Sequence, residues 1–132
     1  YIYCHNKINI LIKSDNTKLG KLGEEQAVNY LQKKRYIVLE KRWKHKRFEI
    51  DIIAKNKETL VFVEVKTRRN SIISINEIVS NAQKDRIIKA AHHYILSNEI
   101  DLNIRFDLVY VDNTQKTFKL KHFKEFFTPH FD

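Results

Sequence analysis

Hydrophobic residues recur at helical spacing in two segments of the chain. In residues 19–36, Ala27, Val28 and Leu31 fall on one face, and the polar residues 14–17 before them include N-cap candidates. The second segment, residues 74–96, has the same spacing at Ile78, Val79, Ala82, Ala90, Tyr94 and Ile95. Both patterns predict amphipathic helices.

Five other segments have the pattern of β-strands: residues 36–40, 48–54, 60–67, 102–111 and 117–123. In the second of them, Phe48, Ile50 and Ile52 alternate with other residues and are expected on one face. The third is almost continuously apolar, which is typical of a strand covered on both faces. The basic segment 41–47 is expected to be a loop, and residues 112–116 a turn.

The order of these elements is helix, three strands, helix, strand and an extra strand. Because a helix separates the third strand from the fourth, a right-handed crossover is expected to make these two strands parallel. We therefore expect an α/β fold with a mixed central sheet flanked by helices, in a single domain over residues 17–132. Residues 1–16, rich in Lys and Asn, are expected to form a tail or an added edge strand.

The amino-acid composition indicates which class of binding partner to expect. The 132 residues include 25 Lys and Arg and 16 Asp and Glu, which gives a formal net charge of +9. This excess favours a polyanion, nucleic acid before an anionic membrane. Two Gly and one Pro exclude a collagenous chain, and Cys4 alone allows no internal disulfide. No stretch approaches the length of a transmembrane helix, so we expect a cytoplasmic protein that does not insert in a membrane.

Both glycines of the chain, Gly20 and Gly23, fall in the first turns of the first predicted helix. Glycine costs about 1 kcal/mol relative to Ala in a helix interior. Their presence there indicates a close backbone approach, either to a neighbouring element or to a phosphate.

Five charged residues interrupt elements that otherwise look covered: Glu24, Glu49, Asp51, Glu64 and Lys66. Strand alternation places Glu49 beside Asp51 and Glu64 beside Lys66, on neighbouring strands. Carboxylates crowded in this way resist ionisation unless a cation lies among them, and oxygen ligands suit Mg²⁺ or Mn²⁺. Such a metal with a nearby Lys can hydrolyse a phosphodiester. The alternative is internal ion pairing without a site.

An early helical Glu, then Asp and Glu-x-Lys, resembles the PD-(D/E)XK nuclease superfamily. The closer resemblance is to the YraN family of small, uncharacterised bacterial proteins. It rests on LGKLGEEQAVNYL, FEIDIIA, ETLVFVEVKTR, DRIIKAAHHYIL and RFDLVYVD, which span residues 19 to about 112. The resemblance implies a restriction-endonuclease-like fold with an αβββαβ core.

The resemblance also implies an active site made of Glu24, Asp51, Glu64 and Lys66. Asp51 and Glu64 would be the principal metal ligands, Glu24 would help through a water or a second metal, and Lys66 would be the catalytic lysine. Glu49 would support them. This set is similar to that of archaeal Holliday-junction resolvases, whose dimeric state suggests a homodimer by analogy.

Two positions depart from the family pattern. Phe48 stands where the family usually has Gly, which is expected to alter how substrate approaches the strand. Gln83, followed by Lys84, stands where the family usually has Lys, which is expected to weaken a phosphate contact.

A second set of candidates is basic. Residues 41–47 hold five Lys or Arg around Trp43, a combination that suits phosphate contacts and base stacking. The alternative is an ordinary charged hairpin with Trp43 in the core. The residues expected to bind nucleic acid are Lys41, Arg42, Trp43, Lys44, Lys46, Arg47, Arg68, Arg69 and Lys84. The six His form no metal-binding pattern.

These observations predict a Mg²⁺- or Mn²⁺-dependent endonuclease that cleaves branched or flapped DNA. One alternative is a non-catalytic nucleic-acid-binding module of the same fold. Another is a protein-interaction domain that uses its aromatic C-terminal segment, residues 123–131.

Overall fold

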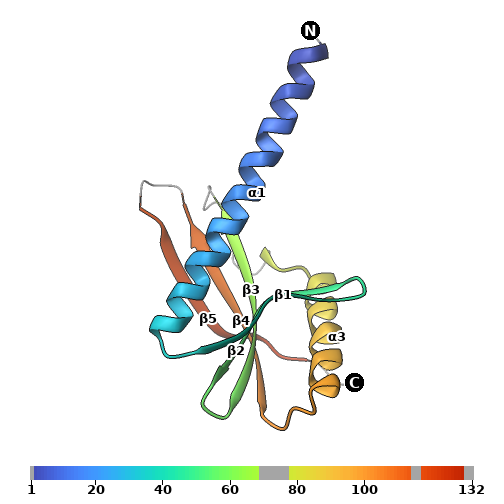
Figure 1. The fold of residues 1–132 in the computed structure, drawn as a ribbon, viewed down its shortest axis with the longest axis vertical. Helices are drawn as coiled ribbons and strands as arrows, with labels where there is room; N and C mark the ends of the chain where they lie inside the picture. Colours follow the sequence, from blue (N-terminus) through green and yellow to red (C-terminus); the bar gives the residue numbers. More distant parts are fainter. Residues whose placement is uncertain (1, 69–77, 114–116, 130–132) are drawn as a thin grey trace.

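The computed structural model describes the backbone of residues 2–68, 78–113 and 117–129, and within these ranges the side chains from Lys18 onward. The elements are helix α1 (Ile2–Lys33), strands β1 (Ile37–His45), β2 (Phe48–Asn56) and β3 (Thr59–Arg68), helix α3 (Asn81–Ser97), and strands β4 (Asn103–Asp112) and β5 (Lys119–Phe127) (Figure 1). The expected order of elements is confirmed.

The strands form one five-stranded sheet in the order β1-β2-β3-β4-β5. β3 and β4 are parallel, and the other neighbouring pairs are antiparallel. The α/β class, the αβββαβ order and the mixed central sheet are therefore confirmed. The parallel pair is the one that the chain joins through α3, as the crossover rule requires.

Two hydrophobic cores lie on opposite faces of the sheet. The α1-side core comprises Ala27, Val28, Leu31, Tyr36, Ile52, Ala54, Val61, Val63, Val65, Val109 and Val111. The α3-side core comprises Ile50, Ile53, Leu60, Phe62, Ile78, Val79, Ile87, Ala90, Ala91, Tyr94, Phe106, Leu108 and Tyr110. Alternate residues of β3 enter the two cores, so the prediction of a strand covered on both faces is confirmed.

The bounds of the helices differ from the prediction. The backbone of residues 2–18 continues α1, so the alternative of an added edge strand is wrong. α1 ends at Lys33, because Arg35 adopts a left-handed φ of 69° and the N–H of Tyr36 donates to the carbonyl of Leu31. α3 begins at Asn81, where the Ser80 side chain accepts a hydrogen bond from the N–H of Gln83 (3.1 Å). The predicted start of that helix, residues 74–77, lies outside the described residues.

The basic segment 41–47 is mostly strand rather than loop. β1 pairs with β2 as far as His45, and only Lys46 and Arg47 form the turn. These residues pair with β2 from Lys41↔Ile52 to His45↔Phe48, and the half-buried Trp43 packs against the α3-side core.

The last strand also extends further than predicted, to Phe127. The ring of Phe127 stacks on Phe106 with centroids 4.9 Å apart, so the described part of the aromatic segment packs on the sheet. Phe126 and Phe127 are half-buried there.

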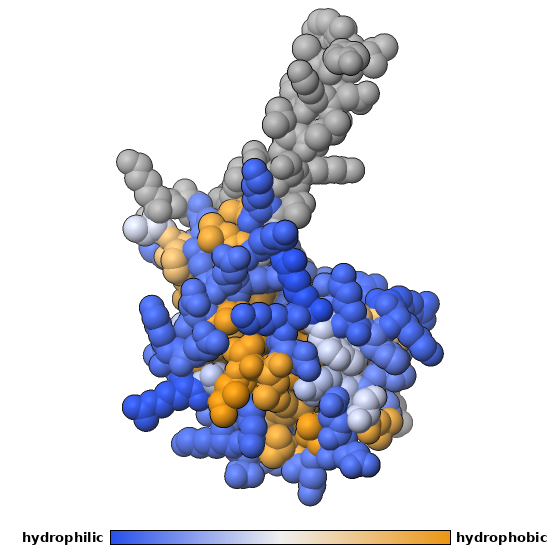
Figure 2. Space-filling model, viewed as in Figure 1, coloured by the Kyte–Doolittle hydropathy of each residue, from blue (hydrophilic) through white to orange (hydrophobic). Residues whose placement is uncertain are grey.

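The visible face of the molecule is largely hydrophilic, with a hydrophobic area near its centre, below α1, and smaller ones toward its edges (Figure 2). Exposed apolar side chains among the described residues include Ile37 and Leu39 in β1. No helix in the described ranges combines the length and the hydropathy that a membrane span needs.

A buried charge network joins β4 to β5. Asp107, 1% exposed, accepts two hydrogen bonds from Arg105 (both 2.8 Å) and one from the N–H of Glu125 (2.9 Å), and its Oδ2 lies 2.7 Å from His122 Nε2. Burial alone would raise the pKa of Asp107. The hydrogen bonds from His122, Arg105 and Glu125 outweigh it, so the pKa lies below its ordinary value. The network fixes β5 where the register with β4 shifts between Phe106 and Leu108.

We expect Asp107→Asn to lower the free energy of unfolding by about 3 kcal/mol, because Arg105 would lose its buried counter-charge. Urea unfolding followed by the fluorescence of Trp43 measures this. Asp101→Asn removes an exposed acid nearby and should change stability by less than about 0.5 kcal/mol. Equal urea midpoints for the two variants would contradict a structural role for the network.

Candidate active site

The site is built where β2 and β3 separate. Their ladder runs from Asn56↔Thr59 to Ile52↔Val63 and ends there. Asp51 is the first residue beyond it, and its Oδ2 accepts a hydrogen bond from the backbone N–H of Val65 (2.8 Å). The side-chain carboxylate thus accepts a hydrogen bond of the kind that backbone carbonyls accept elsewhere in the sheet. This hydrogen bond holds Asp51 against β3.

The neighbouring β1 changes direction at the same level. Arg42 lies between the pairs Lys41↔Ile52 and Trp43↔Ile50, so it is opposite Asp51, and its φ is 49°. On β2, Ile52 enters the α1-side core whereas Ile50 enters the α3-side core. The prediction that these two residues share a face is therefore wrong. A left-handed residue in the paired strand interrupts the pleat, and strict alternation stops there.

Asp51 and Glu64 form a carboxylate pair at the end of the ladder. Burial, and next the negative charge of Glu64, raise the pKa of Asp51 to about 8, against the opposing hydrogen bond from the Val65 N–H. Glu24 adds a smaller repulsion. Two such groups ionise together only when a cation compensates them. Mg²⁺ in proteins commonly binds one or two carboxylates and keeps several waters, so this pair fits a small hard cation.

Lys66 lies beside the pair. Its Nζ is 3.1 Å from Glu64 Oε1, and the two side chains are only 15% and 14% exposed. The structure therefore brings Asp51, Glu64 and Lys66 together, as the sequence predicted. This places a cationic hydrogen-bond donor next to the carboxylates, where a phosphate oxygen or an attacking water would be bound.

Glu24 reaches the same region from α1 but is engaged elsewhere. Its Oε2 forms an ion pair with Nε of Arg42. Within the described parts of the chain, no three His, Cys, Asp or Glu side chains form a group able to hold a metal ion. The predicted third ligand is thus near Asp51 without completing a cluster with it. Its ligand role stays a prediction.

The position of Glu24 depends on the preceding glycine. A Cβ at Gly23 would lie 1.9 Å from Oγ1 of Thr67 in β3, whereas a Cβ at Gly20 would meet nothing within 4 Å. The expected close backbone approach is therefore found at Gly23, and the neighbour is a strand. It brings α1 against β3 at the level of Lys66.

Two grooves run along α1 and meet at Glu24. The one between α1 and the β1–β2 strands has a volume of about 560 Å³, and its wall includes Lys21, Glu25, Lys41, Arg42 and Asp51. The one between α1 and the end of β3 has a volume of about 480 Å³, and its wall includes Leu19, Gly20, Lys66, Thr67 and Arg68.

A third groove opens on the α3 side of the carboxylates. It has a volume of about 250 Å³ and is lined by Arg47, Phe48, Glu49, Asp51, Glu64, Gln83, Arg86 and Ile87. Asp51 also lines the first groove, so it is reachable from both sides of the sheet. Phe48 and Gln83, the two departures from the family pattern, both lie at this third groove, and Glu49 is exposed beside them.

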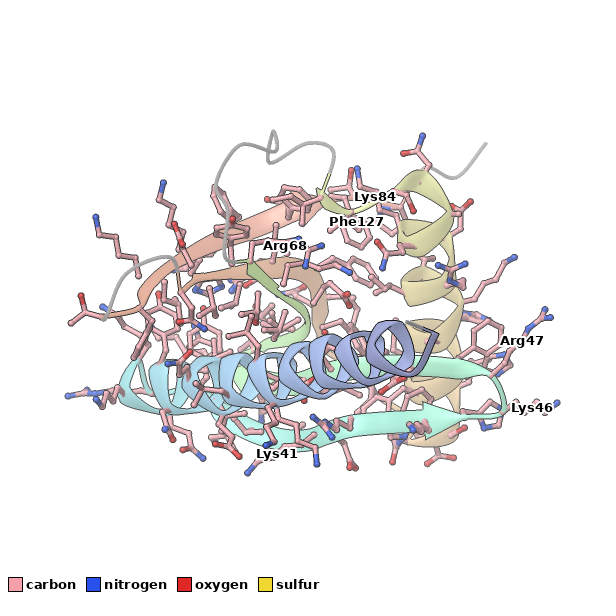
Figure 3. All side chains as sticks on the ribbon, turned by 90° about the horizontal axis from the view of Figure 1, so that it is seen from above. Lys41, Lys46, Arg47, Arg68, Lys84 and Phe127 are labelled. Carbon is pink, nitrogen blue, oxygen red and sulfur yellow. The ribbon has the colours of Figure 1, made fainter. Side chains whose placement is uncertain are left out.

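The basic candidates are distributed around the site. Figure 3 shows Lys46 and Arg47 at the tip of the β1–β2 hairpin, Lys41 farther back along β1, and Arg68 across the sheet. Lys84 lies over the rings of Phe126 and Phe127, at 5.6 and 5.9 Å from their centroids.

The remaining basic candidates have mixed placements. Lys44 is exposed on β1. Trp43 is half-buried, with its ring edge-on to Tyr94 at 5.3 Å. Arg69 lies outside the described residues. The described members of the basic set thus lie on several elements. Lys41 and Arg42 line one groove with Asp51, and Arg47 lines another with Asp51 and Glu64.

Sequence reasoning missed the partner of Glu24 and the partner of Gly23. Arg42 is 18 residues from Glu24, and Thr67 is farther still from Gly23, so no local spacing signals either contact. The only signal was the presence of a glycine inside a helix.

Comparison with known proteins gives a consistent family. A family model described as "Uncharacterised protein family UPF0102" matches residues 23–111, a range that contains Glu24, Asp51, Glu64 and Lys66. Similar curated sequences include a UPF0102 protein of Flavobacterium psychrophilum, 43% identical over 115 residues that cover 86% of this chain and 97% of the relative. Another, from Alkaliphilus oremlandii, is 39% identical over 116 residues, 85% of this chain and 99% of the relative. A third, from Bacteroides thetaiotaomicron, is 37% identical over 117 residues, 88% of this chain and 97% of the relative.

The raised pKa of Asp51 predicts a pH-dependent stability difference. Because the folded state holds this proton up to about pH 8 and an unfolded Asp releases it near pH 4, the wild type loses stability as pH rises between these values. Asp51→Asn keeps an acceptor for the Val65 N–H and has no charge to bury. We expect it to exceed the wild type by about 2 kcal/mol at pH 8 and by much less at pH 5. Urea titrations at both pH values measure this, and a gain that is equal at both would exclude Asp51 titration as its cause.

The two glycines predict opposite effects of the same substitution. Gly23→Ala should destabilise the protein by about 2 kcal/mol, because the new methyl group would push α1 away from Thr67. Gly20→Ala, in open space, should stabilise it by up to about 1 kcal/mol through helix propensity. Thermal unfolding of both variants tests the pair, and a change of the same sign in both would show that α1 is not held by this contact.

Proposed function

Since the chain belongs to the uncharacterised protein family UPF0102, whose name supplies no reaction, we propose that it is a Mg²⁺- or Mn²⁺-dependent endonuclease for branched or flapped DNA. UPF0102 is the YraN family, so the resemblance seen in the sequence is confirmed. The observation that carries the proposal is the carboxylate pair of Asp51 and Glu64, with Lys66 beside it, at the break between β2 and β3.

In the proposed reaction Asp51 and Glu64 hold the metal. When bound, the metal polarises a phosphoryl oxygen and lowers the pKa of a coordinated water. Lys66 donates a hydrogen bond to the attacking water or to the phosphate, and it stabilises negative charge that develops there. Its pairing with Glu64 keeps the ammonium group at this position before substrate arrives.

The grooves on the two sides of Asp51 support a nucleic acid as substrate. Arg42 and Lys41 line one of them and Arg47 lines another, so guanidinium and ammonium groups are available to a phosphate backbone. The net charge of +9 favours the same partner. The preference for branched or flapped DNA, and a homodimeric state, rest on the similarity to junction resolvases. A cytoplasmic location belongs to the proposal as well.

We expect the wild type to cleave a panel of DNA junctions, flaps and single strands in the presence of Mn²⁺. Asp51→Ala and Lys66→Ala should each reduce the rate by about 10²-fold or more, because each removes a group that acts on the transferred phosphate. Lys33→Ala, which removes an exposed charge at the far end of α1, serves as the matched control. Cleavage that survives unchanged in Asp51→Ala and Lys66→Ala would reject the active-site assignment.

A second candidate function is a non-catalytic nucleic-acid-binding module. It is favoured by two observations. Glu24 is paired with Arg42, and among the described residues no three His, Cys, Asp or Glu side chains form a group able to hold a metal ion. This candidate requires salt-sensitive DNA binding that Mg²⁺ and Glu64→Gln leave unchanged. It also requires that Mn²⁺ leave the melting temperature unchanged, whereas a metal-binding enzyme gains about 2.7 kcal/mol at a metal concentration of 100 times Kd.

A further inference from the structure

Arg42 and Glu24 bind each other, although a nuclease would need both groups for other partners. Arg42 lines the groove between α1 and the β1–β2 strands, where a phosphate backbone would lie, and Glu24 lines the same groove, close enough to Asp51 for its charge to raise the pKa of that carboxyl. One carboxylate oxygen of Glu24 is held by the guanidinium. While this ion pair exists, neither side chain is fully available for its proposed ligand.

We propose that Arg42 forms a phosphate-binding subsite with Lys41 and Lys21, and that a phosphate bound there releases Glu24 to the metal held by Asp51 and Glu64. The inference rests on the proposed function and assigns Arg42 a second role. It is a positioning residue for Glu24 as well as a contact to the nucleic-acid backbone. Phosphate binding and metal binding are then coupled, and each strengthens the other.

The backbone conformation of Arg42 is consistent with this role. Its φ of 49° lies in the left-handed region, inside a strand and opposite Asp51. A non-glycine residue in this region costs about 1 kcal/mol or more, and such residues concentrate at functional sites. This φ occurs opposite the point at which the side chains of β2 change face, between Ile52 and Ile50. It also places the Arg42 guanidinium beside α1, where it pairs with Glu24.

The ion pair is weak enough to exchange. The Arg42 side chain is 43% exposed and that of Glu24 is 25% exposed, and pairs of this kind contribute at most about 1 kcal/mol. A phosphodiester offers two oxygens to the planar guanidinium in the same way as a carboxylate does. A phosphate that replaces Glu24 can therefore accept the charge-assisted hydrogen bond that Arg42 Nε donates.

Glu24 needs only a side-chain rotation after release. The contact of Gly23 with Thr67 fixes the backbone of α1 at this level, so the helix itself does not have to move. Glu24 already lines a groove that Asp51 also lines. A freed carboxylate there adds a negative charge next to the Asp51–Glu64 pair, and this charge raises the affinity of the site for a divalent cation.

The first experiment measures binding of a short DNA duplex in EDTA, so that no metal takes part. Glu24→Gln frees Arg42 and should tighten binding about five-fold. The gain should disappear in the Arg42→Gln background. Glu25→Gln is the matched control, since Glu25 is the next residue, is exposed and lines the same groove. An equal gain in Glu25→Gln, or a gain that persists without Arg42, overturns the inference.

The second experiment measures the affinity for Mn²⁺ by calorimetric titration without DNA. Arg42→Gln frees Glu24 and should tighten Mn²⁺ binding about five-fold, and the gain should vanish in the Glu24→Gln background. Lys41→Gln removes the same charge from the same groove and should have a smaller effect. Equal effects of the two substitutions overturn the coupling, because they would reflect only the loss of a positive charge.

The cleavage assay separates this inference from the proposed function. Both couplings without DNA cleavage would reject the endonuclease and leave the phosphate subsite in place. Cleavage without the couplings would reject the subsite and leave the endonuclease in place.

Discussion

The hydrogen bond from the Val65 N–H to Asp51 is the contact on which the site depends. It forms where the β2–β3 ladder has ended, and it replaces a backbone acceptor by a carboxylate. β3 continues beyond this point only because β4 pairs with it on the other side, as far as Arg68↔Asp112. The pairing with β4 thus holds this part of β3 in place. Because β2 no longer pairs with β3 here, the side chains of Glu64 and Lys66 are accessible beside Asp51.

A comparison of Asp107 with Asp51, in the same sheet, shows which interactions the Asp51 carboxylate lacks. Asp107 is the more buried, yet its pKa lies below the ordinary value, because Arg105, His122 and a backbone N–H bond to it. Asp51 has one backbone hydrogen bond, and a second carboxylate beside it, so its pKa is raised. The protein satisfies the Asp107 carboxylate with Arg105 and further hydrogen bonds, and it leaves the Asp51 carboxylate beside a like charge. In the proposed nuclease, a divalent cation would supply to Asp51 the positive charge that Arg105 supplies to Asp107.

The parts of the fold that local patterns control were predictable. The apolar run of β3 predicted a strand covered on both faces, and the helix between β3 and β4 in the chain predicted their parallel pairing. The ends of helices and strands were less predictable, because each can depend on the backbone conformation of a single residue. Arg35 ends α1 with a left-handed conformation that usually favours glycine, and nothing in its side chain signals this. The basic segment of β1 looked like a loop because its charges concealed the pairing with β2.

The sequence by itself determined the order of elements, the covered strand, and the charged residues that interrupt this strand and the one before it, since all of these follow from a periodicity of a few residues. Asp51, Glu64 and Lys66 were identifiable for that reason. Only the tertiary structure decided where the β2–β3 ladder stops, that Gly23 receives Thr67, and that Glu24 is paired with Arg42. These contacts join residues far apart in the chain. They depend on strand register and on the approach of a helix to a sheet, which no local pattern specifies.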